Sequence, residues 1–446
     1  MRVLILFVLA LLSGVGVAAE TVLTIDETRR LALEYNRDLQ SARKELDRSR
    51  GEIISARSGA LPYISLDGRY TRNVKKREMF LPAIFFDSTA GENDFVKIPA
   101  AQNNDFDLSL SLTQPLYVGG KVSAALSIAK IYEDYSAEKV KEVEAAVVFG
   151  AESAFYEALL AEANLEVLRS AYEQISYNLE VVEKSYDQGM VSEYELLRAR
   201  VEKLNLEPQI VAVESEVSLS YKELKSFLGL PLDEEIELVS DLSDTALAEL
   251  PELEVLIDYA LEERPVIKQA DLQTKGYDKA VQVARSDWIY PTLSFNSTYQ
   301  ISASAEDFSL GERNTAKSLT ASLLLSIPLF DGGRTIGEVR KAKVDYYQAL
   351  LAEEKTRDRV RLEVEGAYDA LIRAKKSLEL QKETINQAAE GLRIANLRYE
   401  SGIGTQLEVL SAQTALTEAK SNLARAVYSF RLAKSALKKA VGRDLF

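Results

Sequence analysis

The chain has 446 residues, of which 47% are hydrophobic and 28% charged, and its formal net charge is −15. This composition is that of a folded protein, and the acidic balance without a long basic run argues against nucleic acid as a partner. The absence of Cys and His excludes disulfides, thiol nucleophiles, Cys/His zinc sites and imidazole catalysis. No nucleophile elbow, phosphate-binding loop, dinucleotide motif or calcium loop is found. We therefore expect neither an enzyme nor a bound cofactor or metal.

The first nineteen residues have the pattern of a secretory signal. Arg2 precedes an apolar run from Val3 to Leu12, and Ala18 and Ala19 supply small residues before a cleavage site. We expect residues 1–19 to be removed on export; the alternative is an uncleaved membrane anchor, for which the run is short. No later stretch has the ~20 apolar residues of a transmembrane helix, which leaves a β-barrel as the way to span a membrane.

The remaining chain contains an internal repeat with a constant offset between its two copies. The segment Pro115–Gly120 recurs as Pro328–Gly333, and Tyr186–Gly189 recurs as Tyr399–Gly402, with no net gap between the two matches. Only the first copy carries an insertion, around Asn73 to Ala100. An ungapped match over such a length indicates two copies of one structural plan, in which residues at the same place are repeat equivalents. It divides the chain after the signal into a first repeat, 20–230, a linker, 231–251, and a second repeat, 252–446.

Each repeat is predicted to begin with a helix that leads into two strands. Four stretches alternate apolar with small polar side chains: 64–71, 106–113, 293–301 and 319–326. This period of two suits strands with one face toward lipid and one toward a wet lumen; the alternative is a half-buried soluble sheet. Four strands cannot close a barrel, for which ~8 is the practical minimum. Open edges are not tolerated in lipid, so several chains would pool their strands. A dimer would give eight and a trimer twelve, and the trimer leaves the larger lumen.

Two long helices are predicted to follow the strands in each repeat. Apolar residues step by fours and threes from Val147 to Tyr186, and again from Val360 to Tyr399 with one break at Gln381. The chain then reverses, at Gly189 and again at Gly402, and returns. Many of these positions are Ala, which permits the close packing of a ring of helices. The alternative is a coiled-coil rod, which has no need of strand pairs.

Short motifs mark the start of each predicted element. They are Leu23–Glu27 and Ala32–Asn36 in the opening helix, Leu61-Pro62 and Tyr290-Pro291 before the strands, Gln114–Tyr117 and Ile327–Phe330 before each Gly-Gly pair, and Gly189–Ser192 and Gly402–Thr405 at the reversals. In this order, over the whole chain after the signal, they resemble the TolC family of outer-membrane efflux and secretion channels.

The resemblance implies a mainly α fold with β structure. It implies a trimeric twelve-stranded β-barrel in outer-membrane lipid, four strands per chain, continued by a long α-helical coiled-coil barrel in the periplasm. The implied function is a passive channel for efflux or type I secretion, recruited by an inner-membrane pump and a periplasmic adaptor. The alternative function is a periplasmic coiled-coil structural or adaptor protein.

The resemblance also implies an adaptor-docking surface at the two reversals. Its residues are Gly189, Met190, Val191, Ser192, Gly402, Ile403, Gly404 and Thr405. Glycine permits a sharp reversal, and small neighbours leave the backbone open to a partner. The alternative is that these residues only turn the chain.

A gate at the same tips is implied by three further residues. Tyr399 and Glu195 resemble a gating hydrogen-bond pair, and Glu408 resembles one member of an acidic ring; the alternative for each is a solvated helix face. Gly404 stands where the best-known member has an Arg of the gate, which implies a gate held more loosely. Ser411 stands where that member has a second acidic residue, which implies a weaker cation block. Separately, a proline within the first return helix, Pro208, is expected to bend or interrupt it.

Overall fold

The computed structural model describes residues 21–443 except for 87, 90, 92–93, 240–249 and 309–313. The predicted signal, residues 1–19, lies outside the described residues, as does the middle of the predicted linker. The chain divides into a helical unit of residues 1–45, 137–269 and 354–446, and a strand unit of residues 46–136 and 270–353. Among the described residues, no helix combines the length and the apolar character that crossing a bilayer requires.

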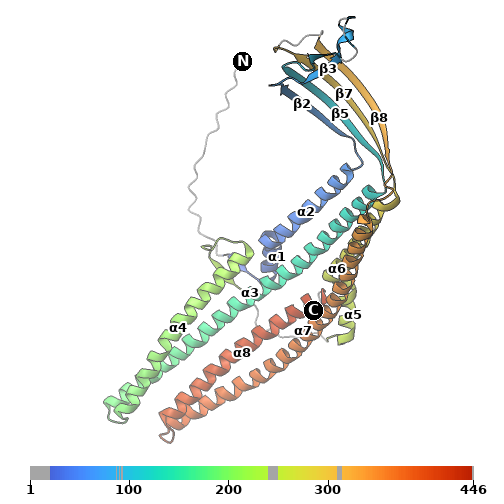
Figure 1. Cartoon of the computed structure of the whole chain (residues 1–446). Coiled ribbons are helices and arrows are strands. Elements are labelled where there is room, and N and C mark those ends of the chain that lie inside the picture. The colour runs from blue at the N-terminus through green and yellow to red at the C-terminus, as the bar shows by residue number, and fades with distance from the viewer. Residues whose placement is uncertain are drawn as a thin grey trace, which may run out of the picture. The chain divides into compact units, whose positions relative to one another are not determined.

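The strand unit is built on one four-stranded antiparallel sheet. Its strands are β2 (Tyr63–Arg72), β5 (Asn104–Val118), β7 (Thr292–Ala305) and β8 (Thr315–Ser326), and they lie side by side in the order β2-β5-β7-β8 (Figure 1). The central pair, β5 and β7, joins the two repeats. Alternation predicted these four strands, and β2 and β8 form the two edges of the sheet.

The insertion of the first repeat forms a hairpin beyond the end of β2. It consists of β3 (Glu78–Pro82), a short 3₁₀ turn η1 (Ala83–Phe85) and β4 (Phe95–Pro99), with β3 and β4 antiparallel. The remainder of the strand unit is helical: part of α2 (Arg37–Ser58), most of α6 (Pro265–Ile289), and the first turns of α3 (Lys121–Asp187) and α7 (Arg334–Glu400).

The passage from β5 into α3 depends on glycine. Gly119 and Gly120 have φ values of +66° and +80°, in the left-handed region that side chains rarely adopt. A Cβ on Gly119 would also lie 2.9 Å from Cβ of Tyr290. The repeat-related junction uses Gly332 and Gly333, again with positive φ. The Gly-Gly pairs are therefore the turn that redirects each strand into its long helix.

The helical unit contains the two long hairpins. The long helices α3 and α7 have 67 residues each, or about 100 Å at ~1.5 Å per residue, and the return helices α4 (Glu193–Leu228) and α8 (Gln406–Val441) have 36 each. The short helices α1 (Ile25–Tyr35) and α5 (Leu253–Glu263) pack beside them. Strand β1 (Thr21–Leu23) pairs in parallel with β6 (Ile236–Leu238), which lies in the predicted linker.

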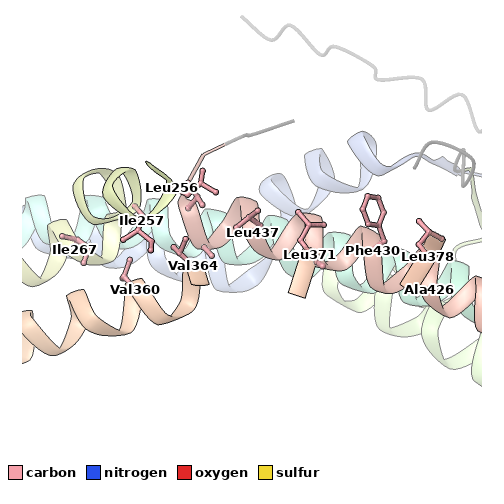
Figure 2. Packing of buried hydrophobic residues seen from close by; sticks show 14 residues of the cluster. Leu256, Ile257, Ile267, Val360, Val364, Leu371, Leu378, Ala426, Phe430 and Leu437 are labelled. Atoms are coloured by element: carbon pink, nitrogen blue, oxygen red, sulfur yellow. The ribbon is translucent and has the colours of Figure 1, made fainter. Parts of the chain in front are cut away.

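Two hydrophobic cores lie at repeat-related places in the helical unit. One contains Val147, Phe155 and Leu224, and the other contains Val360 and Leu437, with residues of α5 against it (Figure 2). Val147 and Val360 are repeat equivalents, as are Leu224 and Leu437. Full burial of such a side chain contributes roughly 1.5–3 kcal/mol. The stepping of fours and threes thus predicted the packed seams correctly.

The sequence indicated irregularities at two helix positions, Pro208 and Gln381. The helix α4 runs through Pro208 without ending there, so the proline does not interrupt it, although it removes one backbone donor from the helix. Gln381, the break in the apolar stepping, is half-buried, and its Oε1 has no hydrogen-bond partner among the described residues.

Candidate functional site at the helix tips

The first reversal is closed by backbone hydrogen bonds around Gly189. Its φ is +72°, its N–H donates to the carbonyl of Tyr186 at 2.8 Å, and Met190 N–H donates to Ser185 at 2.9 Å. A Cβ on Gly189 would meet nothing within 4 Å. The backbone conformation, and not crowding, therefore requires glycine. Met190 is exposed, whereas Val191 is half-buried against the small core of Val182.

The return helix α4 begins with a capping box formed by two of the predicted site residues. Ser192 Oγ accepts the N–H of Glu195, and Glu195 Oε2 accepts the N–H of Ser192, both at 3.3 Å. This reciprocal pair satisfies donors that have no partner inside the helix. Glu195 therefore has a local structural role beside the predicted gate. The pattern Ser-x-x-Glu could have shown this from the sequence alone.

The second reversal is tighter than the first. Gly402 has φ +70°, and the N–H groups of Ile403 and Gly404 both donate to the carbonyl of Arg398, at 3.0 and 2.8 Å. A Cβ on Gly404 would lie 2.9 Å from both Cβ of Arg398 and N of Tyr399. This turn leaves no room for a side chain at 404. The departure from the gate Arg is thus tied to the path of the backbone, and Ile403 beside it is exposed.

Thr405 has the same role as its repeat equivalent Ser192, whereas Glu408 differs from its repeat equivalent Glu195. Thr405 Oγ1 accepts the N–H of Glu408 at 3.3 Å and caps α8. The Glu408 carboxylate, however, lies 3.3 Å from Nε of Arg398, and both side chains are exposed. Arg398 was not predicted as a site residue. Its contact crosses the turn, and helical periodicity gives no signal for it.

Tyr399 and Glu195 come from different hairpins and are close enough to interact. Burial raises the pKa of the Tyr399 hydroxyl, and the negative charge of Glu195 raises this pKa further. The ring of Tyr399 packs against the small core that contains Leu392 and Val409. The structure thus brings together the two residues of the predicted gating pair, while Glu408 is engaged by Arg398.

Two buried glutamines near the tip were missed by the sequence analysis. Gln406 and Gln413 are each 3% exposed, and neither Gln406 amide atom nor Gln413 Nε2 has a hydrogen-bond partner among the described residues. Their spacing of seven continues through Lys420 to Val427, so the four share one face of α8. The only available signal was this spacing.

The same face of α8 lines a groove against α3. The groove has a volume of about 570 Å³, and its wall includes Tyr156, Leu160 and Val167 of α3 with Lys420, Val427 and Arg431 of α8. The two hairpins of one chain therefore meet along an α3–α8 seam. Within the described residues, no group of three or more carboxylates is placed to hold a metal ion.

Comparisons with known proteins agree with this architecture. The family model for Outer membrane efflux protein matches residues 28–230 and 256–443. Outer membrane protein TolC of Salmonella enteritidis is 22% identical over 433 residues, covering 95% of this chain and 82% of the relative. Nodulation protein T of Rhizobium leguminosarum bv. trifolii is 22% identical over 418 residues, covering 92% and 83%. A membrane protein from Pseudomonas aeruginosa has a similar crystal structure, with a TM-score of 0.76 at 19% identity over 94% of this chain and 93% of that one.

The family match covers both repeats, from the opening helix to the end of α8. The structural likeness extends over the sheet and the long helices together. The chain therefore belongs to the outer membrane efflux proteins of the TolC family, and is a non-enzymatic outer-membrane channel for efflux or secretion.

Proposed function

We propose that three copies of this chain close into one passive duct, which a periplasmic adaptor connects to an inner-membrane pump. The observation that carries the proposal is a pair of exposed apolar stripes in the helical unit. Leu197, Leu204 and Val211 are exposed on α4. Their repeat equivalents are Leu410, Thr417 and Ala424; Ala424 lines the groove against α3, and Leu410 and Thr417 precede it at heptad spacing on the same face of α8.

The long helix α7 carries the matching stripe. Ile372 and Leu380 are exposed, and their repeat equivalents, Leu159 and Val167, line the groove on α3. Each chain thus buries one α3–α8 seam and leaves the two halves of an equivalent α4–α7 seam open. Because the halves lie on different hairpins, α4 of one copy fits α7 of the next, which is the head-to-tail contact from which rings are built.

The sheet supports the same assembly. Each edge strand, β2 and β8, has one partner among the described residues, and open edges are not tolerated in lipid. Pairing β2 of one copy with β8 of the next removes every edge. Three copies give the twelve strands that the family resemblance implies, a number large enough to enclose a lumen.

The tips supply the contact with the adaptor and the gate. Met190 and Ile403 place apolar side chains at the ends of the two hairpins, next to the left-handed glycines Gly189 and Gly402. We propose that an adaptor docks end-on at this apolar surface. The charge of Glu195 acts on the Tyr399 hydroxyl of the other hairpin, and we propose that this pair holds the duct closed and that its separation opens the duct.

The first test is the native mass of the protein extracted from outer membranes in mild detergent. We expect three times the mass of one chain for the wild type. Leu204→Glu should dissociate the assembly into monomers, because it places a charge in the α4–α7 seam. Asn205→Glu is the matched control: it adds the same charge at a position whose repeat equivalent, Glu418, is exposed. A monomeric wild type, or equal masses for both variants, would contradict the proposed ring.

A further inference from the structure

The helical unit contains a second groove, remote from the helix tips, which we call the α8-end groove. It has a volume of about 520 Å³, a size typical of sites for small organic molecules. Its walls come from α1, α3, α8 and the junction of α5 with α6, all within the helical unit of one chain. Its wall on α3 ends at Glu152, about 50 Å from the end of α3 at ~1.5 Å per residue. The proposed ring, adaptor contact and gate make no use of this groove.

Positive charge is concentrated in the α8-end groove, although the chain as a whole is acidic. Six cationic side chains line it: Arg29, Lys141, Lys268, Lys438, Lys439 and Arg443. Each of the three carboxylates in its wall already pairs with one of these cations, at 2.5 or 2.6 Å: Glu152 with Arg29, Glu138 with Lys141, and Glu263 with Lys268. The excess positive charge therefore belongs to the cations at the end of α8. A groove whose walls carry an excess of one charge focuses its field and attracts ligands of the opposite charge.

Two of the cations at the end of α8 lie over aromatic rings of the groove. Lys439 Nζ is 4.8 Å from the centroid of the Phe149 ring, and Arg443 Cζ is 5.3 Å from that of the Tyr259 ring. Contact with a ring face positions a cation without using its hydrogen-bond donors. Neither Lys439 nor Arg443 forms an ion pair with a carboxylate among the described residues. Both are therefore held in place with donors that a ligand can use.

The internal repeat shows that ending a return helix does not require these two cations. A cation in the last turn is favourable, because it faces the negative end of the helix dipole. In α4 the last turn has Lys225 alone as its basic residue. At the places of Lys439 and Arg443 the first repeat has Ser226 and Leu230. The additional charge at the end of α8 therefore needs another explanation.

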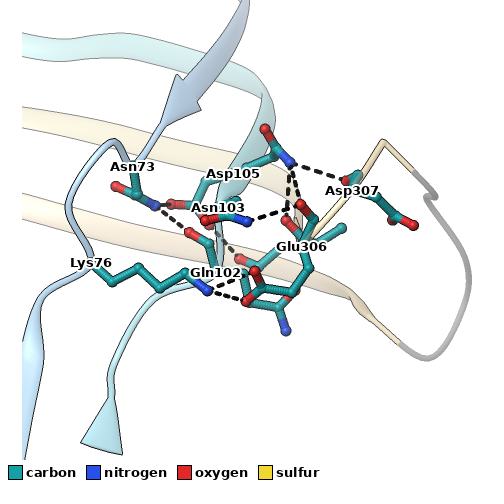
Figure 3. Close-up of polar contacts among 10 residues, drawn as sticks. Asn73, Lys76, Gln102, Asn103, Asp105, Glu306 and Asp307 are labelled. Atoms are coloured by element: carbon teal, nitrogen blue, oxygen red, sulfur yellow. Dashed lines mark hydrogen bonds and ion pairs between the residues drawn. The ribbon is translucent and has the colours of Figure 1, made fainter.

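The polar network under the β3–β4 hairpin, in the strand unit, shows the opposite pattern. Lys76 Nζ donates to both carboxylate oxygens of Glu306, at 2.5 and 2.6 Å (Figure 3). Asn73 Nδ2 donates to Oδ2 of Asp105 at 2.7 Å, and Asn104 Nδ2 donates to the carbonyl of Glu306 at 3.1 Å. These polar groups satisfy one another within the chain, as such groups usually do. The excess charge of the α8-end groove is not balanced in this way.

We propose that the α8-end groove binds an organic polyanion of the size of an acidic dipeptide, with its carboxylates on Lys439 and Arg443. Lysine and arginine form strong charge-assisted hydrogen bonds with carboxylates, and the arginine fork matches a carboxylate with two parallel donors. Val148 and Phe149 supply an apolar wall for the body of the ligand. A single inorganic ion would fill only a small part of the groove, and cations at separate positions suit a ligand with separate carboxylates.

Calorimetric titration of the detergent-solubilised full-length protein with N-acetylated diglutamate tests the site. We expect the wild type to bind this peptide, and the affinity to fall as salt screens the charges. Lys439→Gln with Arg443→Gln should weaken binding by roughly tenfold or more, because it removes two charge-assisted contacts. Lys439→Arg with Arg443→Lys keeps both charges and should retain most of the affinity.

A matched control removes the same two kinds of charge elsewhere. Arg373 and Lys375 are exposed on α7, outside the groove, so Arg373→Gln with Lys375→Gln should leave the affinity close to that of the wild type. The native mass of every variant should equal that of the wild type, whatever the number of copies, so this test does not depend on the ring. Loss of binding together with a lower native mass would assign Lys439 and Arg443 a structural role and reject the site.

Three further outcomes would overturn the proposal. The first is that the wild type does not bind the acidic peptide at low salt. The second is an equal loss of affinity in the control variant, which would reduce the effect to general attraction by a less acidic protein. The third is equally tight binding of the uncharged diglutamine peptide or of inorganic phosphate, which would contradict recognition of an organic polyanion.

Discussion

At the scale of single residues, the two helix tips carry different charged side chains, although they are equivalent in the internal repeat. Glu195 and Glu408 are repeat equivalents, yet Glu195 closes a capping box and Glu408 pairs with Arg398. Ser185 is the repeat equivalent of Arg398, so the first tip lacks this cation. The second tip therefore carries an ion pair that the first tip lacks, and the charge of Glu195 raises the pKa of Tyr399 on the other hairpin.

The raised pKa of Tyr399 predicts how the tip responds to pH. A hydroxyl whose pKa is raised in the folded tip stabilises that tip. The stabilisation is fully present at pH values below the ordinary pKa of tyrosine, about 10. The contribution is lost as the pH rises through the folded pKa, because the phenolate then faces Glu195. We expect the conductance of the isolated channel in a planar bilayer to rise above about pH 10.

Two variants separate this effect from general unfolding at high pH. Tyr399→Phe, which has no proton to lose, should abolish the rise and open the gate at every pH. Glu195→Gln removes the charge but keeps the capping box, since Gln serves as well as Glu there. It should move the rise to lower pH, because the pKa of Tyr399 falls. A rise of the same size and midpoint in all three proteins would remove both residues from the gate.

At the scale of helices and strands, the periodicity of the sequence predicted those features that regular packing determines, namely the buried helix positions and the strands. The stepping of fours and threes predicted the buried positions of α3 and α7, and alternation predicted the four strands. Contacts that cross a turn or join distant short segments carry no periodic signal. That explains why the Arg398–Glu408 pair, the three-residue strand β6 and the network under the hairpin were not predicted.

The buried face of α8 carries the prediction at this scale. Gln413 lies within the helical unit with an amide nitrogen that has no partner among the described residues, and an unpaired buried donor costs roughly 1–3 kcal/mol. Gln413→Met removes that donor and keeps a similar shape. We expect the thermal unfolding temperature to rise, and the conductance to fall if the α3–α8 seam loosens when the duct opens.

An exposed glutamine supplies the control. Gln387 on α7 donates to Oε1 of Glu383 at 3.1 Å, so Gln387→Met should leave both quantities close to those of the wild type. A fall in the unfolding temperature of Gln413→Met would show that the Gln413 amide of the wild type is hydrogen-bonded in the assembled protein, by water or by a neighbouring copy. The amide would then stabilise the α3–α8 seam.

At the scale of the whole molecule, the internal repeat gives one chain two halves with complementary surfaces. Each half presents a long helix and a return helix, and the halves of one chain satisfy each other at β5–β7 and along the α3–α8 seam. In the ring that we propose, another copy covers the surfaces that remain: the edge strands β2 and β8 of the sheet, and α4 and α7 of the helical unit. This follows from the strand order and the constant offset of the repeat, and the sequence predicted it only as a need to pool strands.

This division of surfaces predicts that the covalent link between the repeats is dispensable. Two polypeptides, 1–239 and a signal-bearing 250–446, keep every element whole, including the β1–β6 pair within the first half. Expressed together, they should assemble into particles with the native mass of the uncut channel. Expressed alone, each half lacks both the β5–β7 partner and its side of the α3–α8 seam, so neither should form a channel in bilayers. If the paired halves fail to associate while the uncut chain forms trimers, the linker itself must hold the repeats in register, and complementarity between the repeats would be too weak to order the ring.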